Sequence, residues 1–249
     1  MDVLSLGPLR VRKFVKTSGN TPKTGGDPPL TVVLMHGYGA PGDDLVGLGG
    51  AIAAPVGTTF LFPEAPSGLT GPAALMTLTD EGRQWWEIDV GRFQRAAMLG
   101  TTEKLVEDVP AGLADARAAV IAMLDAYERE TSTPSSQIML GGFSQGSMLA
   151  LDVALHTERA LAGVVILSGT LIASNDWLPR MPARKDLHVF QSHGTRDPIL
   201  PFPIAERLRH ELENAGMRVS FTSFDDGHGI PPEVMRDLGT WLTRVPSHV

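Results

Sequence analysis

The sequence predicts an α/β fold with a mostly parallel central sheet and helices on both faces. Short, continuously apolar segments such as 30–35 and 161–167 are typical of strands that are buried on both faces. They alternate with segments that have the apolar period of a helix, for example 204–215. This alternation is typical of strands joined by crossover helices. A chain of 249 residues is long enough for one large core, so we expect a single domain over residues 1–249.

The individual elements follow from local signals. Strand-forming residues at 3–6 and 9–15 flank Gly7-Pro8 and predict an edge hairpin. A helix is expected over 103–130, and Pro110 should delay its start to about Asp108 or kink it. The other expected strands are 30–35, 58–62, 137–140, 161–167, 187–191 and 219–224, and the other expected helices are 147–155, 204–215 and one that begins at Pro231-Pro232.

Composition excludes several classes of function. The net charge of −7 argues against nucleic acids and anionic membranes as partners, because both attract basic surfaces. Cysteine is absent, which excludes disulfides, thiolate metal ligands and a cysteine nucleophile. No signal peptide and no apolar stretch of membrane-spanning length is apparent. We therefore expect no stable membrane insertion and a cytoplasmic location.

The segment Gly142-Phe143-Ser144-Gln145-Gly146 carries a G-x-S-x-G motif. It lies between an apolar strand and a helix, which is the context of a nucleophile elbow. In an elbow the serine hydroxyl stands clear of the backbone on a strained turn, and small residues on either side avoid collisions with neighbouring elements. The motif alone is a weak signal, so the prediction of a serine nucleophile needs partner residues.

Asp197 and His228 supply the partners. Each follows a predicted strand, and the carboxyl ends of parallel strands meet at one edge of the sheet. The chain order Ser144, Asp197, His228 is the order found in α/β hydrolases. It predicts acyl transfer in which Ser144 attacks, His228 acts as base and Asp197 orients the imidazole. Asp225 and Asp226 are alternative acids, but they lie so close to His228 in sequence that a role in the turn is favoured.

The glycine-rich turn that follows strand 30–35 has two interpretations. Gly37, Gly39 and Gly42 form a G-x-G-x-x-G pattern, and Glu64 follows about twenty residues later, as in an NAD(P)-dependent oxidoreductase. Pro41 weakens that interpretation, because it removes an N–H that should bind phosphate. Asp43 and Asp44 also place negative charge where a pyrophosphate would lie.

In the hydrolase interpretation the same turn contributes to an oxyanion hole. Glycines let the backbone approach a tetrahedral intermediate, and one N–H from this loop joins the N–H of the residue after the nucleophile. Tyr38 N–H and Gln145 N–H are the expected donors.

Residues 63–100 form a long segment without clear periodicity and are expected to build a substrate pocket or lid. Trp85, Trp86 and Met76 in this segment, together with Leu171, are the candidate substrate-binding residues. The alternative is that the two tryptophans pack in the core, which is where apolar residues usually lie.

The remaining polar residues do not indicate a second type of catalytic or binding site. The sequence has no H-E-x-x-H or similar spacing, so no metal site and no cofactor are expected. His36 and His193 each precede a glycine at a strand end and are interpreted as residues that order loops. Glu87 and Asp89 could suggest the paired carboxylates of a glycosidase, but a polar edge beside the tryptophans is favoured.

Several stretches together resemble the phospholipase/carboxylesterase group of α/β-hydrolases, which includes the acyl-protein thioesterases. These stretches are 34–39, 85–89, 141–146, 167–169, 193–201 and 227–233. The resemblance implies the α/β-hydrolase fold, the roles given above for Ser144, Asp197 and His228, and a possible homodimer. Ser147 and Gly229 differ from the glycine and the glutamate expected there, which bears on substrate preference.

The expected function is therefore that of a serine hydrolase. It would cleave carboxylic ester or thioester bonds of small-molecule substrates with small to medium acyl groups, through an acyl-enzyme intermediate. A binding protein that merely shares the fold should lack an intact set of nucleophile, base and acid, and this sequence retains all three.

Overall fold

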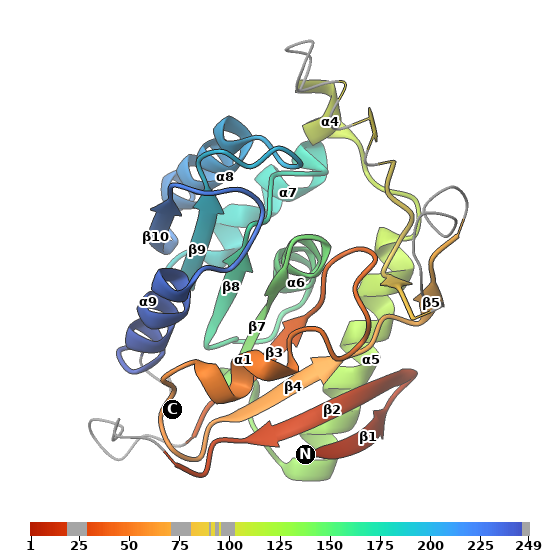
Figure 1. The fold of residues 1–249 in the computed structure, drawn as a ribbon, viewed down its shortest axis with the longest axis vertical. Helices are drawn as coiled ribbons and strands as arrows, with labels where there is room; N and C mark the ends of the chain where they lie inside the picture. Colours follow the sequence, from red (N-terminus) through yellow and green to blue (C-terminus); the bar gives the residue numbers. More distant parts are fainter. Residues whose placement is uncertain (19–28, 71–80, 90, 93–94, 96–102, 246–249) are drawn as a thin grey trace.

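A computed structural model describes residues 1–18, 29–70, 81–89, 91–92, 95 and 103–245. An eight-stranded sheet runs through the molecule in the order β1-β2-β4-β3-β7-β8-β9-β10 (Figure 1). The strands are β1 (Asp2–Leu6), β2 (Leu9–Val15), β3 (Thr31–Met35), β4 (Thr59–Pro63), β7 (Ile138–Phe143), β8 (Gly163–Leu167), β9 (His188–Gly194) and β10 (Arg218–Phe224). A separate two-stranded sheet pairs β5 (Ser67–Gly68) with β6 (Arg83–Gln84).

The sheet is antiparallel at one edge and parallel elsewhere. Strands β1 and β2 form the expected hairpin, and β2 also pairs with β4 in the antiparallel direction. From β4 through β10 every neighbouring pair is parallel. The predicted α/β class with a mostly parallel sheet is confirmed.

Helices cover both faces of this sheet (Figure 1). They are α1 (Val46–Ala51), α4 (Glu103–Glu107), α5 (Leu113–Thr131), α6 (Gln145–His156), α7 (Ser174–Arg180), α8 (Phe202–Asn214) and α9 (Pro232–Leu242), with 3₁₀ turns at Ser135–Gln137 and Met181–Arg184. Successive side chains of a strand point to opposite faces, so β3 divides its apolar residues between two cores. Val33 and Met35 pack with α5 and α6, whereas Val32 and Leu34 pack with α9. The continuous apolar run of β3 is thereby explained.

Two helices differ from the expectation. The helix expected over 103–130 is divided into α4 and α5, because Pro110 has no N–H to donate and Gly112 adopts a left-handed φ of 88°. Helix α7 was not expected. It is seven residues long, contains Pro179 and follows Ala173 at a φ of 46°, so it has too little periodic sequence to be recognised.

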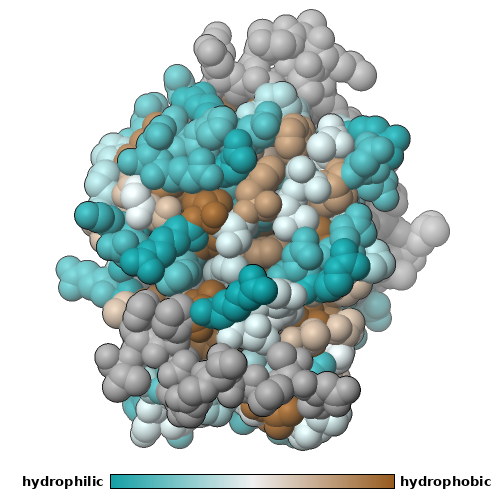
Figure 2. Space-filling model, turned by 90° about the vertical axis from the view of Figure 1, so that its left-hand side faces the viewer, coloured by the Kyte–Doolittle hydropathy of each residue, from teal (hydrophilic) through white to brown (hydrophobic). Residues whose placement is uncertain are grey.

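The surface over α8, β10 and α9 is mostly hydrophilic (Figure 2). Helix α8 directs Ile204, Leu208 and Leu212 into the core, and its other side carries charged residues. No helix within the described ranges is long and apolar enough to cross a lipid bilayer.

Backbone packing at two glycines sets the position of the turn between β7 and α6. A Cβ atom on Gly146 would lie 2.1 Å from the Met35 carbonyl oxygen and 2.6 Å from that of His36. A Cβ on Gly142 would lie 2.4 Å from the same Met35 oxygen. The end of β3 therefore packs directly against this turn, and only glycine fits at either position.

Gly146→Ala should destabilise the protein by about 3 kcal/mol or more, because the new methyl group would overlap backbone atoms that cannot move independently. Gly50→Ala is the matched control, since a Cβ there meets nothing within 4 Å and alanine favours helix α1. Urea unfolding of both variants checks this expectation, and equal stabilities would contradict the packing described here.

Candidate active site

Ser144 lies on a strained turn at the carboxyl end of β7. Its φ and ψ angles are 51° and −118°, a conformation that residues with side chains rarely adopt. Hydrogen bonds to the neighbouring strand and to the first turn of α6 hold this turn. Ser144 N–H donates to Leu167 O of β8 at 2.8 Å, and Ser144 O accepts hydrogen bonds from Ser147 Oγ at 2.7 Å and Met148 N–H at 3.2 Å. This geometry is that of a nucleophile elbow.

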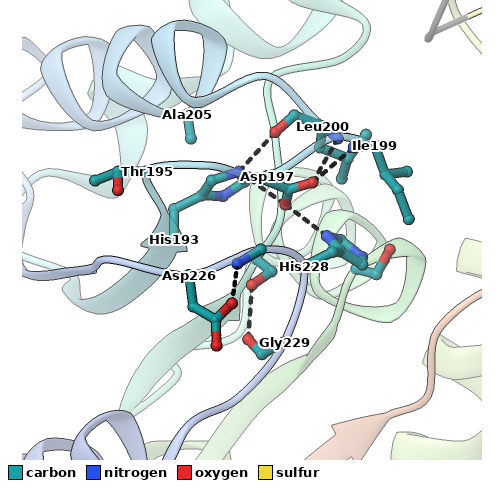
Figure 3. A network of polar contacts seen from close by, with 12 residues as sticks. His193, Thr195, Asp197, Ile199, Leu200, Ala205, Asp226, His228 and Gly229 are labelled. Atoms are coloured by element: carbon teal, nitrogen blue, oxygen red, sulfur yellow. Dashed lines mark hydrogen bonds and ion pairs between the residues drawn. The ribbon is translucent and has the colours of Figure 1, made fainter.

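Asp197 and His228 come together from two different loops. Asp197 follows β9 and His228 follows β10, and their side chains meet with His228 Nδ1 2.6 Å from Asp197 Oδ2 (Figure 3). The other carboxylate oxygen accepts the N–H groups of Ile199 at 2.8 Å and Leu200 at 2.9 Å. Since an ionised carboxylate only accepts hydrogen bonds, Nδ1 carries the proton and Nε2 is left as the basic nitrogen.

Neither alternative acid contacts His228. Asp226 Oδ1 accepts the N–H of Gly227 at 2.7 Å, and Asp225 pairs with Arg196. Both are turn residues, as the sequence favoured.

A second histidine lies on the other side of Asp197. His193 Nε2 is 3.3 Å from Asp197 Oδ2 and 2.8 Å from the carbonyl oxygen of Leu200 (Figure 3). Burial alone would raise the pKa of Asp197, but hydrogen bonds from His193, His228 and Leu200 N–H outweigh burial and hold that pKa well below its usual range. Asp197 is therefore a carboxylate at any pH near neutrality.

Close backbone contacts fix the two loops relative to each other and to the elbow. A Cβ on Gly194 would lie 2.2 Å from Gly227 O, so the loop that carries His228 rests directly on the end of β9. Ser168 Oγ donates to Gly229 O at 2.9 Å, and Ser168 itself follows β8, the strand next to β7. Side chains from three strand ends are thus held at one edge of the sheet.

Ser144 and His228 line one pocket of about 140 Å³. Its other walls are largely apolar: Gly37, Tyr38, Ala40, Ile88, Phe143, Met148, Ile199 and Leu200. Within the described residues the Ser144 hydroxyl makes no hydrogen bond to His228, although the two groups face the same space. Catalytic hydrogen bonds are often formed only in the substrate complex.

Two backbone N–H groups near Ser144 have no backbone acceptor among the described residues: that of Tyr38, which lines the pocket, and that of Gln145, which directly follows Ser144. Tyr38 lies in the loop after β3, and Gln145 is the first residue of α6, where helical N–H groups are free and the helix dipole favours negative charge. Their role as oxyanion donors stays a prediction.

His36 orders the start of this loop. Its Nε2 accepts the N–H of Ala65 at 3.1 Å, so Nδ1 carries the proton and donates to Gly37 O at 2.8 Å. Burial lowers the pKa of His36, which keeps the ring neutral in this arrangement.

The tryptophans expected at the pocket lie in the core instead. Trp85, Trp86 and Leu171 are buried in the same hydrophobic cluster as α5 and α6, and none of them lines the pocket. Trp85 also donates from its indole N–H to His36 O at 3.1 Å, so it packs against the start of the loop after β3 rather than lining the pocket. Met76 lies outside the described residues.

The residues that do line the pocket were not identified from sequence, with the exception of those in the motifs. Phe143 belongs to the elbow itself, and Ile199 and Leu200 directly follow Asp197. The sequence signal that could have identified these three pocket residues was their proximity to Ser144 and Asp197. Ile88 is the pocket residue that the long segment 63–100 contributes from its described part.

Glu64 does not have the environment that a dinucleotide site requires. Arg12 and Arg83 contact its two carboxylate oxygens at 2.8 Å and 3.0 Å, and a Cβ on Gly42 would lie 2.4 Å from its Cγ. The carboxylate is committed to these partners and fills the space beside the glycine turn.

One group of potential metal ligands occurs in the described ranges, at Asp152, His156 and Asp176. These side chains already bind one another and their neighbours. Asp152 accepts hydrogen bonds from Trp177 Nε1 at 2.9 Å and Arg117 at 3.1 Å, and His156 Nε2 contacts Asp176 at 2.9 Å. The arrangement is a polar network between α5, α6 and α7 in which Asp152 is buried and the other two residues are partly exposed.

Comparisons with known proteins show to which family the chain belongs. Residues 23–245 match the family model described as Phospholipase/Carboxylesterase. Acyl-protein thioesterase 1 of Mycosarcoma maydis is 29% identical over 255 residues, which cover 93% of this chain and 97% of the relative.

Solved structures show the same fold. The crystal structure of esterase PE8 superposes with a TM-score of 0.70 at 25% identity, covering 93% of this chain and all of that one. A Bacillus cereus carboxylesterase superposes with a TM-score of 0.66 at 18% identity, covering 96% and 95% of the two chains. The chain therefore belongs to the phospholipase/carboxylesterase family and is a serine hydrolase with the α/β-hydrolase fold.

Proposed function

We propose that the protein hydrolyses carboxylic esters or thioesters of small to medium acyl groups through an acyl-enzyme formed on Ser144. The observation that carries this proposal is that Ser144 and His228 share one pocket while Asp197 binds the far nitrogen of the His228 ring. His228 Nε2 takes the hydroxyl proton of Ser144 as Ser144 Oγ attacks the substrate carbonyl carbon. The same nitrogen then returns the proton to the departing alcohol or thiol.

Water completes the cycle by the reverse route. It enters after the leaving group departs, loses a proton to His228 and attacks the acyl-enzyme, and Ser144 is released with the carboxylic acid. In both steps the carbonyl oxygen becomes an oxyanion that Tyr38 N–H and Gln145 N–H stabilise. Each such donor contributes about a hundred- to a thousand-fold to turnover.

The walls of the pocket support an acyl substrate. Ile88, Phe143, Met148, Ile199 and Leu200 present aliphatic and aromatic surface beside the serine. Such surface favours a hydrocarbon chain over a charged or sugar group, since a polar group there would be buried without partners. The thioesterase name of the Mycosarcoma maydis relative is the reason to test thioesters beside oxygen esters.

Ser144→Ala should lower the turnover of p-nitrophenyl butyrate by about four to six orders of magnitude, because the nucleophile is removed while binding remains. A fluorophosphonate probe should label the unmodified protein at Ser144 and leave the variant unlabelled, as read by peptide mass spectrometry. Ser135→Ala, a change in the 3₁₀ turn at the opposite end of β7 from Ser144, is the control. Full turnover by Ser144→Ala would remove Ser144 from this role.

The acid limb of log kcat/KM against pH should rise with a slope of one. Because the folded-state pKa of Asp197 lies below the usual value of about 3.9, this carboxyl is protonated only as the pH falls through that lower value. Between about pH 5 and 8 it stays ionised, so Asp197 takes up no proton there and does not steepen the pH dependence of activity. Initial rates across this range check the slope, and a slope near two would mean that a second group titrates with the base.

Changes at Ile88 should move the preferred acyl length in opposite directions. This half-buried side chain lines the pocket, so Ile88→Ala should favour longer p-nitrophenyl esters and Ile88→Phe shorter ones. One methylene in an apolar pocket typically changes kcat/KM by about ten-fold or more. The measurement is kcat/KM from acetate to octanoate, with the exposed Val56→Ala as control. Identical profiles for all variants would place the acyl chain elsewhere.

A further inference from the structure

We propose that Glu64 is a positioning residue for the oxyanion hole, acting through Arg83. The inference rests on the proposed function, because it concerns the loop that carries the Tyr38 N–H. It begins from the fact that the Glu64 side chain is about nine-tenths buried, directly after β4, yet has no part in the mechanism described above.

Backbone hydrogen bonds attach the loop after β3, which carries Tyr38, to Arg83. Gly39 N–H donates to Arg83 O at 2.8 Å, and Arg83 N–H donates to Ala40 O at 3.0 Å. Gly39 adopts a φ of 79°, so the chain reverses immediately after Tyr38. The direction of the Tyr38 N–H therefore depends on where the backbone of Arg83 lies.

Glu64 connects Arg83 to the central sheet by ion pairs. One carboxylate oxygen lies 3.0 Å from Arg83 Nη2, and the other lies 2.8 Å from Arg12 Nη1. Arg12 belongs to β2, in register with Phe62 of β4. Both side chains are largely buried, so the Arg12–Glu64 pair is held more firmly than a surface ion pair.

Glu64 also contacts the far end of the loop. Its side chain covers Gly42 so closely that a Cβ there would lie 2.4 Å from Glu64 Cγ. One side chain thus supports the loop at Gly42 directly and at Gly39 and Ala40 through Arg83.

The segment that begins at Arg83 reaches the second oxyanion donor as well. The Gln145 side chain accepts the N–H of Trp85 at 3.0 Å and donates to Trp86 O at 2.7 Å. Segment 83–86 is therefore hydrogen-bonded to both donor regions. Its first residue binds the loop that carries Tyr38, and its last two residues bind the Gln145 side chain. Displacement of this segment would change the separation of the two N–H groups.

The expected effect is on turnover rather than on substrate binding. Oxyanion donors act on charge that develops in the transition state, and a displacement of about 1 Å can cost up to a hundred-fold. Glu64→Gln keeps the shape of the side chain and removes the charge that holds Arg83. It should lower kcat for p-nitrophenyl butyrate about 10- to 100-fold and leave KM within about two-fold.

The experiment compares Glu64→Gln, Arg83→Gln and the double variant in the 249-residue protein. The two single changes should each lower kcat, and the double variant should be no worse than the poorer single one, because both break the same link. Affinity for phenylboronic acid, which forms a tetrahedral adduct with the serine, should fall by the same factor as kcat/KM. Arg218→Gln is the control, since it breaks the exposed pair with Asp186.

The outcomes separate this proposal from the proposed function. Absence of esterase activity and of fluorophosphonate labelling in the unmodified protein would overturn the proposed function, and this inference with it. An active protein in which both single variants keep kcat and boronate affinity within two-fold would overturn the role of Glu64 alone, as would a loss confined to KM. Should Glu64→Gln not fold, Arg83→Gln decides the matter, because the Arg83 side chain is one-third exposed and its loss leaves Glu64 paired with Arg12.

Discussion

Direct contact between the backbone of β3 and the turn after β7 is the constraint on which the rest of the site depends. With glycine at positions 142 and 146, the carbonyl oxygens of Met35 and His36 approach the elbow within distances that no Cβ would allow. The strained φ of Ser144 is maintained by this contact, by the hydrogen bond to Leu167 O and by the start of α6. Since the loop after β3 begins at the same point, the contact also holds Tyr38 of that loop beside the pocket that Ser144 lines.

The charge on Asp197 depends on the groups that surround its carboxylate. Asp197 is almost completely buried, which by itself would favour its neutral form. Two backbone N–H groups and two histidines bind its oxygens, and together they keep it ionised. The negative charge in turn fixes which nitrogen of His228 carries a proton, so the basic nitrogen is the one available to the pocket.

Support for the pocket comes mainly from residues that do not line it. Trp85 packs behind the loop of Tyr38 and donates to His36 O, while the Gln145 side chain joins the backbone of Trp85 and Trp86. Buried hydrogen bonds among these residues thus support the apolar surface of the pocket. Buried polar networks of this kind are favourable only when every member has a partner, which makes their geometry specific.

The sequence by itself determined the alternation of strands and helices, the elbow around Ser144, and the strand ends that carry Asp197 and His228. These features depend on local patterns, namely apolar period and turn chemistry, and on the rule that parallel strands present their carboxyl ends at one edge. Only the tertiary structure decided that Trp85, Trp86 and Leu171 are core residues, that His193 contacts Asp197, and that Glu64 pairs with three arginines. The physical reason is that these contacts join segments far apart in the chain, and whether a side chain faces a pocket, a core or an ion partner depends on what packs against it, which no local pattern records.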